Sequence, residues 1–118
     1  MRDGRLADLS MEFAVEIINL VRSLKEKKES IISGQIGRSG TSIGANIREA
    51  NYAHSKADFI AKMQIALKEA NETGYWLELL VKTSLIDREI FKKLDDMCGT
   101  LRVLLIKSVN TAKGEGWK

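Results

Sequence analysis

Glycine is concentrated in one stretch of the chain, residues 33–44, which reads SGQIGRSGTSIG. A glycine-rich turn that leads into a helix can hold the phosphates of a nucleotide, so the stretch raises the question of an NTP-dependent enzyme. The pattern G-x-x-x-x-G-K-[ST] fails here. Counted from Gly34, Ser39 stands where the second glycine is needed and Gly40 where the lysine is needed. The sequence therefore does not favour a phosphate-binding loop.

The same stretch has the spacing of an amphipathic helix. Apolar and small residues recur every three or four positions and continue through the glycines without a break. Each glycine inside a helix costs about 1 kcal/mol relative to alanine, and a contact must offset that cost. We therefore predict a helix whose small residues let a second helix approach closely. The predicted core positions are Ile32, Ile36, Gly40, Ile43, Ile47 and Ala50, and the small positions are Gly37, Gly40, Gly44 and Ala45.

Other catalytic and metal-binding chemistry has few candidate residues. The only histidine, His54, cannot supply the two Glu-x-x-His pairs of a di-iron site, which excludes such a site within one chain. The only cysteine, Cys98, falls at an apolar position and is interpreted as a core residue rather than a nucleophile. Glu69 and Glu72, one helical turn apart, are interpreted as surface ion-pair partners. We expect a protein that is not an enzyme, with no catalytic residue, metal, cofactor or small-molecule substrate.

The composition favours a single all-α domain. The 118 residues include no proline, 44% of them are apolar and 30% are charged. An interior proline would cost a helix about 3 kcal/mol, so the absence of proline favours long helices. β-Branched residues do not alternate with polar ones, which argues against a sheet. A single cysteine, no long apolar run and no basic-then-apolar leader predict a soluble cytoplasmic protein without a membrane span.

Four amphipathic segments predict an up-down-up-down four-helix bundle. We expect helices over residues 10–28, 29–53, 55–83 and 88–112, followed by a frayed tail over 113–118. Ser55, with Asp58 three residues on, and Asp87 are predicted N-caps. The other predicted core rows are Phe13, Ile17, Leu20 and Leu24 in the first helix; Phe59, Met63, Ala66, Ala70, Thr73, Leu77 and Leu80 in the third; and Ile90, Leu94, Met97, Leu101, Leu104 and Ser108, joined by Phe91, Cys98 and Leu105, in the fourth.

A second apolar row on the third predicted helix consists of Ile65, Trp76 and Leu79 and lies to the side of the core row. One monomeric core does not need both rows. We therefore predict that these three residues face another subunit or a partner. Ion pairs four residues apart are predicted on the wetter side of this helix: Lys68 with Glu72, and Glu78 with Lys82.

Positive charge is distributed unevenly along the chain. The net charge is +3, and the segment after Asp96 holds four basic residues against one acidic residue, a difference of three that accounts for all of it. A second basic cluster closes the first predicted helix. Such residues suit contacts to RNA phosphates, and they also serve solubility and the helix dipole. The candidate nucleic-acid-binding residues are Arg102, Lys107 and Lys113, in a segment that also holds Glu115 and Lys118, and the cluster Lys25, Lys27 and Lys28.

Three stretches, TSIGANIREA, SKADF and IALKEANETGYWLELL, resemble the four-helix-bundle proteins named after intervening sequences in bacterial 23S ribosomal RNA genes. The resemblance extends from SMEFAVEIINLV to LRVLLIKSV. A common form of the family has arginines where this chain has Ala53 and His54, which lessens the case for a basic patch at that corner. The residues that match the family pattern are Ser42, Ile43, Asn46, Ile47, Glu49, Ser55, Asp58, Phe59, Ala66, Glu69 and Ala70.

The resemblance implies a bacterial bundle that assembles into rings, with homopentamers among its relatives. It also implies kinship to the accessory protein of diversity-generating retroelements, a basic pentameric bundle that works with a reverse transcriptase and nucleic acid. Asn46 and Glu49 stand one turn apart near the end of the second predicted helix, and we predict that they brace the corner with the third.

We therefore expect a homo-oligomeric bundle that binds RNA or a ribonucleoprotein through its basic surfaces. Contacts to phosphates would dominate, so binding would weaken with salt and discriminate little between bases. The alternative is a protein-interaction scaffold with no nucleic-acid role, in which the second apolar row of the third helix receives a partner helix.

Overall fold

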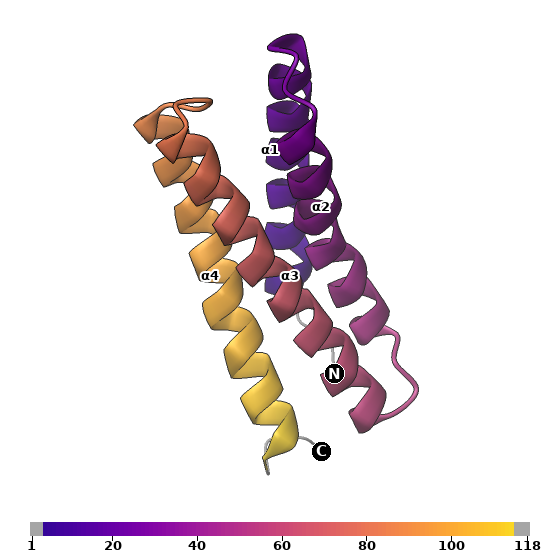
Figure 1. The fold of residues 1–118 in the computed structure, drawn as a ribbon. Helices are drawn as coiled ribbons and strands as arrows, with labels where there is room; N and C mark the ends of the chain where they lie inside the picture. Colours follow the sequence, from indigo (N-terminus) through magenta and orange to yellow (C-terminus); the bar gives the residue numbers. More distant parts are fainter. Residues whose placement is uncertain (1–3, 115–118) are drawn as a thin grey trace.

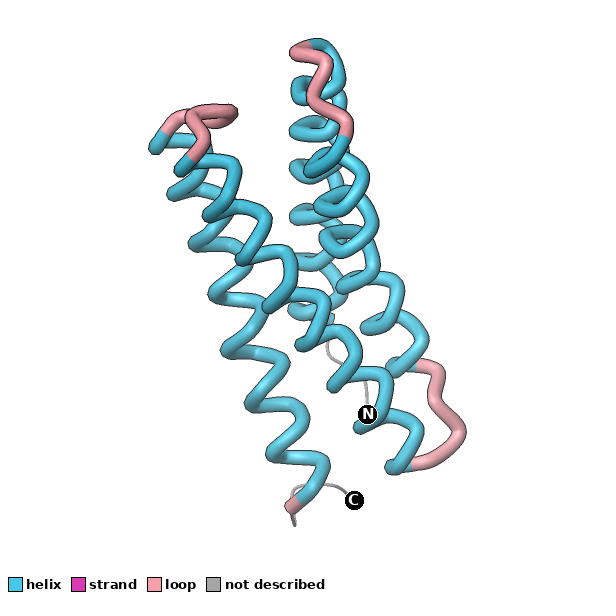
Figure 2. Tube along the Cα trace, viewed as in Figure 1, coloured by secondary structure: helices cyan, strands magenta, loops and turns pink. Residues whose placement is uncertain are grey.

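The structure is a computed structural model that describes residues 4–114, and it is all-α. Four helices follow one another, each antiparallel to the one before it, with short loops between them (Figures 1 and 2). The predicted up-down-up-down four-helix bundle is therefore confirmed, and residues 4–114 contain no strand. The helices are α1 (Gly4–Glu26), α2 (Ile31–Asn51), α3 (Lys56–Lys82) and α4 (Arg88–Lys113).

The bundle is elongated, with dimensions of 48 × 21 × 19 Å, and its helices pack unevenly. The contact between α2 and α3 is the most extensive, whereas that between α1 and α4 is the sparsest. The α1–α2 and α3–α4 loops lie at one end of the molecule, which we call the loop end (Figure 1). The α2–α3 corner lies at the other end, together with the start of α1 and the finish of α4. Residues near the finish of α1 or α3, or near the start of α2 or α4, therefore lie at the loop end.

The core rows predicted for the first three helices are buried. All seven positions of the α3 row are at most 3% exposed, from Phe59 to Leu80. The one polar member of that row, Thr73, donates a hydrogen bond to the Ser39 hydroxyl of α2 at 2.9 Å, which satisfies two buried hydroxyls together.

The core row predicted for α4 is partly wrong. Ile90 is 43% exposed, while Met97, Leu104 and Ser108 are only half-buried. Apolar residues occur on several sides of this helix, and packing selects the side on which the small Cys98 and Ala112 allow close contact. Met97 instead lines a gap beside α1, where the bundle is least tightly packed. The buried row of α4 is Leu94, Cys98, Leu101, Leu105, Val109 and Ala112.

The helix boundaries lie within two residues of the predictions except at the start of α1. α1 begins at Gly4 rather than at residue 10, and its added turns bury Leu6 completely. α2 begins at Ile31, because the Glu29 carboxylate accepts hydrogen bonds from the backbone N–H groups of Ile31, Ile32 and Ser33. This cap was not predicted. α4 continues to Lys113, and the rest of the predicted frayed tail lies outside the described residues.

Gly37, Gly40 and Gly44 of α2 face α1, as their small size predicted, whereas Ala45, the fourth predicted small position, is exposed. A Cβ added at Gly40 would lie 2.8 Å from Cγ1 of Ile17, and one at Gly37 would lie 3.2 Å from Cγ2 of Val21. A Cβ at Gly44 would meet the Ser10 hydroxyl oxygen at 3.2 Å. The opening stretch is therefore a helix whose glycines form the close contact with α1.

Both loops at the loop end are Schellman turns closed by residues other than glycine. The N–H groups of Ser84 and Leu85 donate to the carbonyls of Val81 and Leu80, and residues 28 and 29 repeat this pattern after α1. Ser84 has φ 61 and Lys28 has φ 63, in the left-handed region where a side chain is strained.

Replacing Ser84 by glycine is expected to stabilise the protein by about 1 kcal/mol, because glycine adopts this backbone conformation without a side-chain clash. The measurement is the free energy of unfolding in urea. Serine-to-glycine substitution at Ser30, where φ is −117, is the control and is not expected to stabilise the protein. Equal effects at the two positions would contradict the explanation from backbone strain.

Candidate nucleic-acid interface

The two predicted basic clusters lie at opposite ends of the bundle. Lys25 is in the last turn of α1, and Lys27 and Lys28 follow that helix at the loop end, whereas Lys107 and Lys113 lie near the other end of the molecule, toward the finish of α4 (Figure 1). Because the molecule is 48 Å long, the clusters do not form one continuous basic surface.

In the loop-end cluster, one ammonium group already has a structural partner. Lys27 Nζ donates to the Leu85 carbonyl oxygen at 2.9 Å and so connects the two loops. Lys25 and Lys28 are exposed, and Glu26 between them offsets part of their charge.

The α4 cluster is more strongly basic. Residues 97–113 of α4 include three basic side chains and no acidic one. Lys107 and Lys113 are exposed, whereas Arg102 is half-buried against α3. A Cβ at Gly74 of α3 would lie 3.0 Å from Nη1 of Arg102, and Nη1 itself lies 3.6 Å from the Cys98 sulfur. Arg102 therefore places its charge over the junction between α3 and α4.

α3 adds a further basic residue, Lys68, which was predicted to form an ion pair with Glu72. The predicted Lys68–Glu72 ion pair is not formed, and exposed Lys68 has no ion pair among residues 4–114. Gly74 of α3 lies level with Arg102. Lys68 lies six residues before Gly74 on α3, and Lys107 lies five residues after Arg102 on α4. Because the two helices are antiparallel, Lys68 and Lys107 are therefore at about the same height along the bundle axis. We call Lys68, Tyr75, Arg102, Lys107 and Lys113 the α3/α4 basic face. Arg102 and Lys113 share one side of α4, whereas Lys107 lies about 140° around the helix from Arg102.

Two carboxylates close to Lys68, those of Glu69 and Glu72, are bound to Arg38 of α2. Its guanidinium contacts Glu69 at 3.1 Å and also forms a short ion pair with Glu72. This confirms the interpretation of the two glutamates as ion-pair partners, although the partner is on another helix. The indole N–H of Trp76 donates a hydrogen bond to Glu72 at 3.0 Å. This bond, and next the hydrogen bond from Arg38, hold the pKa of the Glu72 carboxyl below its usual value. Their negative charge is therefore largely compensated within the fold.

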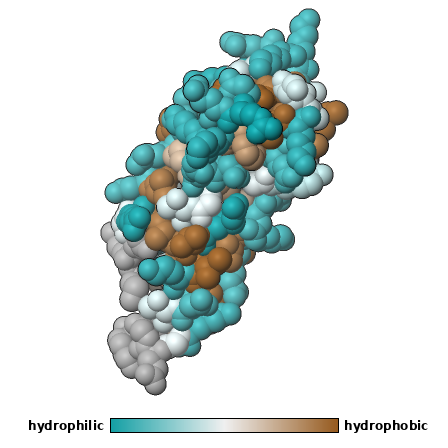
Figure 3. Space-filling model, turned by 90° about the vertical axis from the view of Figure 1, so that its left-hand side faces the viewer, coloured by the Kyte–Doolittle hydropathy of each residue, from teal (hydrophilic) through white to brown (hydrophobic). Residues whose placement is uncertain are grey.

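Of the three residues predicted to form an oligomer interface, only one is well exposed. Ile65 is 41% exposed, whereas Trp76 and Leu79 are half-buried against the core. Other exposed apolar residues form a row on α1, at spacings of four and three: Met11, Val15 and Ile18. On the side of the molecule that carries α4, apolar patches lie between hydrophilic side chains (Figure 3).

A groove of about 590 Å³ separates the first half of α1 from the second half of α2. Small residues form much of its surface, and Met11, Arg48 and Tyr52 lie among them. The groove continues the exposed apolar row of α1 and offers a surface for a helix of another chain.

The residues that carried the family resemblance have structural contacts. Ser55 accepts a hydrogen bond from the Asp58 N–H at 3.1 Å as the predicted N-cap of α3, and Phe59 is buried. Glu49 forms an ion pair with Lys62 of α3 at 3.3 Å, near the corner that it was predicted to brace. Asn46 donates instead to the Ser42 carbonyl of its own helix at 2.9 Å.

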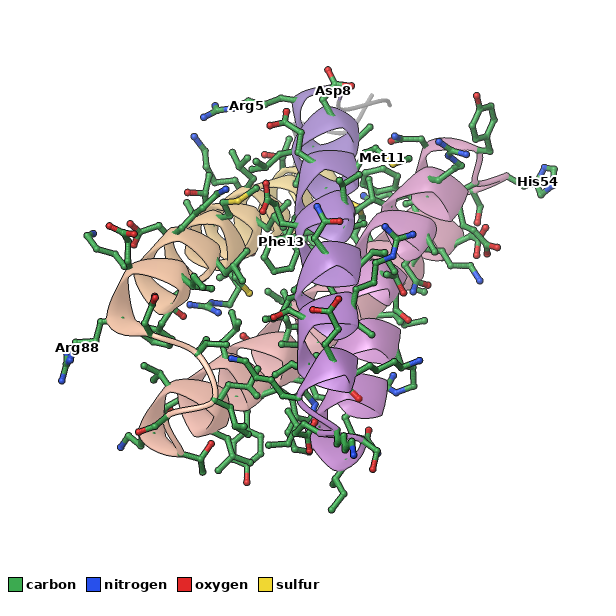
Figure 4. All side chains as sticks on the ribbon, turned by 90° about the horizontal axis from the view of Figure 1, so that it is seen from above. Arg5, Asp8, Met11, Phe13, His54 and Arg88 are labelled. Carbon is green, nitrogen blue, oxygen red and sulfur yellow. The ribbon has the colours of Figure 1, made fainter. Side chains whose placement is uncertain are left out.

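The titratable candidates for catalysis lie apart. His54 is exposed and projects away from the α2–α3 corner, while Phe13 points into the bundle (Figure 4). Cys98 is fully buried, and burial raises the pKa of its thiol to about 11, against the opposing effect of Arg102. In residues 4–114, no three His, Cys, Asp or Glu side chains gather closely enough to hold a metal ion. No helix of this part combines the length and apolar character needed to cross a bilayer.

Comparisons with known proteins agree with this architecture. The chain is similar to a protein of unknown function from the S23 ribosomal protein family of Bacteroides thetaiotaomicron VPI-5482, known from a crystal structure at 1.70 Å resolution. The two chains are 55% identical with a TM-score of 0.87, and the match covers 88% of this chain and 97% of the other. No curated protein matches the chain. The profile of the 23S rRNA-intervening sequence protein family matches residues 2–107, so the chain belongs to that family.

Proposed function

We propose that this protein is a non-enzymatic, cytoplasmic RNA-binding bundle and that the α3/α4 basic face is its RNA-binding surface. The observation that carries the proposal is the charge of this face. Lys68, Lys107 and Lys113 are exposed and form no ion pair within residues 4–114, and Arg38 binds Glu69 and Glu72 close to Lys68. The family's link to 23S ribosomal RNA supports RNA as the ligand.

Binding on this face rests mainly on phosphates. Lysine ammonium groups on flexible side chains bind phosphates as point charges and carry little sequence information. The resulting affinity therefore depends strongly on salt, because each phosphate contact releases condensed counterions.

We also propose that the protein is a homo-oligomer. The exposed apolar row of α1 (Met11, Val15 and Ile18) supports self-association, and Ile65 adds an exposed apolar side chain on α3. A pentamer is the form that the family resemblance implies. The second candidate function, a protein-interaction scaffold, is favoured by the groove between α1 and α2, whose small residues suit a partner helix.

The test of RNA binding is a salt titration with nuclease-treated protein and a labelled structured RNA. Four basic residues in contact with phosphates predict a log–log slope of about −3, at about −0.7 for each contact to an unpaired strand. Absence of binding at low salt would contradict the proposal and favour the scaffold. In that case Met11→Glu, which places a charge in the groove between α1 and α2, would test whether this groove binds a second copy of the chain or another protein.

A further inference from the structure

We infer that Tyr75 is a stacking platform for an unpaired RNA base, with Lys68 and Arg102 beside it to hold the adjoining phosphates. The inference rests on the proposed RNA-binding function and assigns it a class of ligand, a single-stranded segment. Tyr75 was not among the residues predicted from the sequence, although its spacing of seven residues from Lys68 placed the two on one side of a helix.

Tyr75 is both exposed and held in place. Its side chain is 59% exposed, and its ring packs edge-to-face on Trp76 with a centroid distance of 5.0 Å and an interplanar angle of 73°. Trp76 is anchored by the hydrogen bond from its indole to Glu72, which Arg38 holds in turn. An aromatic ring that is already fixed loses little conformational entropy when a base stacks on it.

Positive charge lies on two sides of the ring. Lys68 stands two turns before Tyr75 on the same side of α3; its ammonium forms no ion pair within residues 4–114, although it interacts electrostatically with Glu72. The Arg102 guanidinium lies against Gly74, the residue next to Tyr75. Glu69 and Glu72 lie between Lys68 and Tyr75 in the chain, and both bind Arg38 of α2. Glu78, three residues after Tyr75, forms an ion pair with Lys82 at 3.3 Å. An exposed aromatic ring among cations is the arrangement by which proteins bind single strands.

An unpaired strand suits this site better than a duplex. In double-stranded RNA the bases are stacked on each other, and the deep, narrow major groove excludes side chains. Tyr75 stands on the convex outer side of a helix, where a base already turned away from its neighbours can reach the ring. The site therefore favours loops, bulges and ends of RNA.

The test compares a short adenine-rich RNA strand that contains one 2-aminopurine with the same strand annealed to its complement. Binding to the full-length protein is measured by anisotropy, and stacking by the 2-aminopurine fluorescence. Tyr75→Ala is expected to weaken binding of the single strand about tenfold and to abolish the fluorescence change. Tyr75→Phe, which keeps the aromatic face, is expected to stay within about twofold of the wild type. The control is Tyr52→Ala, which removes a tyrosine that is 66% exposed in the α1–α2 groove.

The outcomes separate this inference from the proposed function. A loss for Tyr75→Ala with an unchanged salt slope supports stacking, since the slope counts phosphate contacts. If wild type binds the strand and Tyr75→Ala binds it equally well, RNA binding stands and the stacking platform is wrong. Tighter binding of the duplex than of the strand would also overturn the inference. If the wild type binds neither RNA, the proposed function itself fails.

Discussion

Replacing Gly40 by valine is expected to destabilise the bundle by about 3 kcal/mol. A Cβ at this position would already lie 2.8 Å and 2.9 Å from two carbons of the Ile17 side chain and 3.3 Å from its Cβ. Ile17 is fully buried and β-branched, so it cannot turn aside without a clash elsewhere in the core. The two further methyl groups of valine would force α1 away from α2. Urea unfolding followed by circular dichroism measures the change in free energy.

Gly34 provides the matched control, because it lies in the same helix and nothing is within 4 Å of an added Cβ. Gly34→Val is expected to be neutral or to stabilise by a few tenths of a kcal/mol, since valine has the better helix propensity. If both valine substitutions shifted stability equally, helix propensity rather than the contact with α1 would govern the role of these glycines.

Reversal of three lysines on the α3/α4 basic face is expected to weaken RNA binding on the order of 100-fold at low salt. The variant combines Lys68→Glu, Lys107→Glu and Lys113→Glu, all at exposed positions, so the fold is retained. Arg102 is left unchanged because it is packed against Gly74. The salt titration is expected to lose about 2 units of slope, at about 0.7 for each contact.

The control is a reversal with the same change of charge at the loop end. Arg22→Glu, Lys25→Glu and Lys28→Glu also alter exposed side chains. Each triple variant changes the net charge by three times −2, from +3 to −3, so the long-range field changes equally. The loop-end variant is expected to retain most of its affinity. Equal losses in both variants would show that total charge, rather than this face, determines binding.

Several features follow from the sequence alone because they depend on local spacing. Apolar residues every three or four positions predict helices, and the row from Phe59 to Leu80 identified the buried side of α3. The Ser55 and Asp87 caps were recognisable because serine and aspartate are preferred N-cap residues. In the structure each side chain accepts a hydrogen bond from the backbone N–H three residues further along the chain. The glycines of α2 were recognisable as a contact surface, since their cost in an isolated helix requires compensation.

Other features depend on how the helices are rotated against each other. The side of α4 that is buried could not be predicted, because apolar residues occupy several sides and only packing against α3 selects one. Neighbours in the chain suggested Lys68 as the partner of Glu72, but Arg38 of another helix binds that carboxylate instead. Lys68 is thereby available to the α3/α4 basic face.

The placement of the basic residues shows the same division. The sequence determined that lysines close α1 and that α4 ends without acidic residues, since both are properties of short segments. Only the antiparallel packing places these clusters at opposite ends and brings Arg102 beside Gly74. Such proximity between distant segments depends on the register and rotation of whole helices, which many weak contacts determine together and no local pattern encodes.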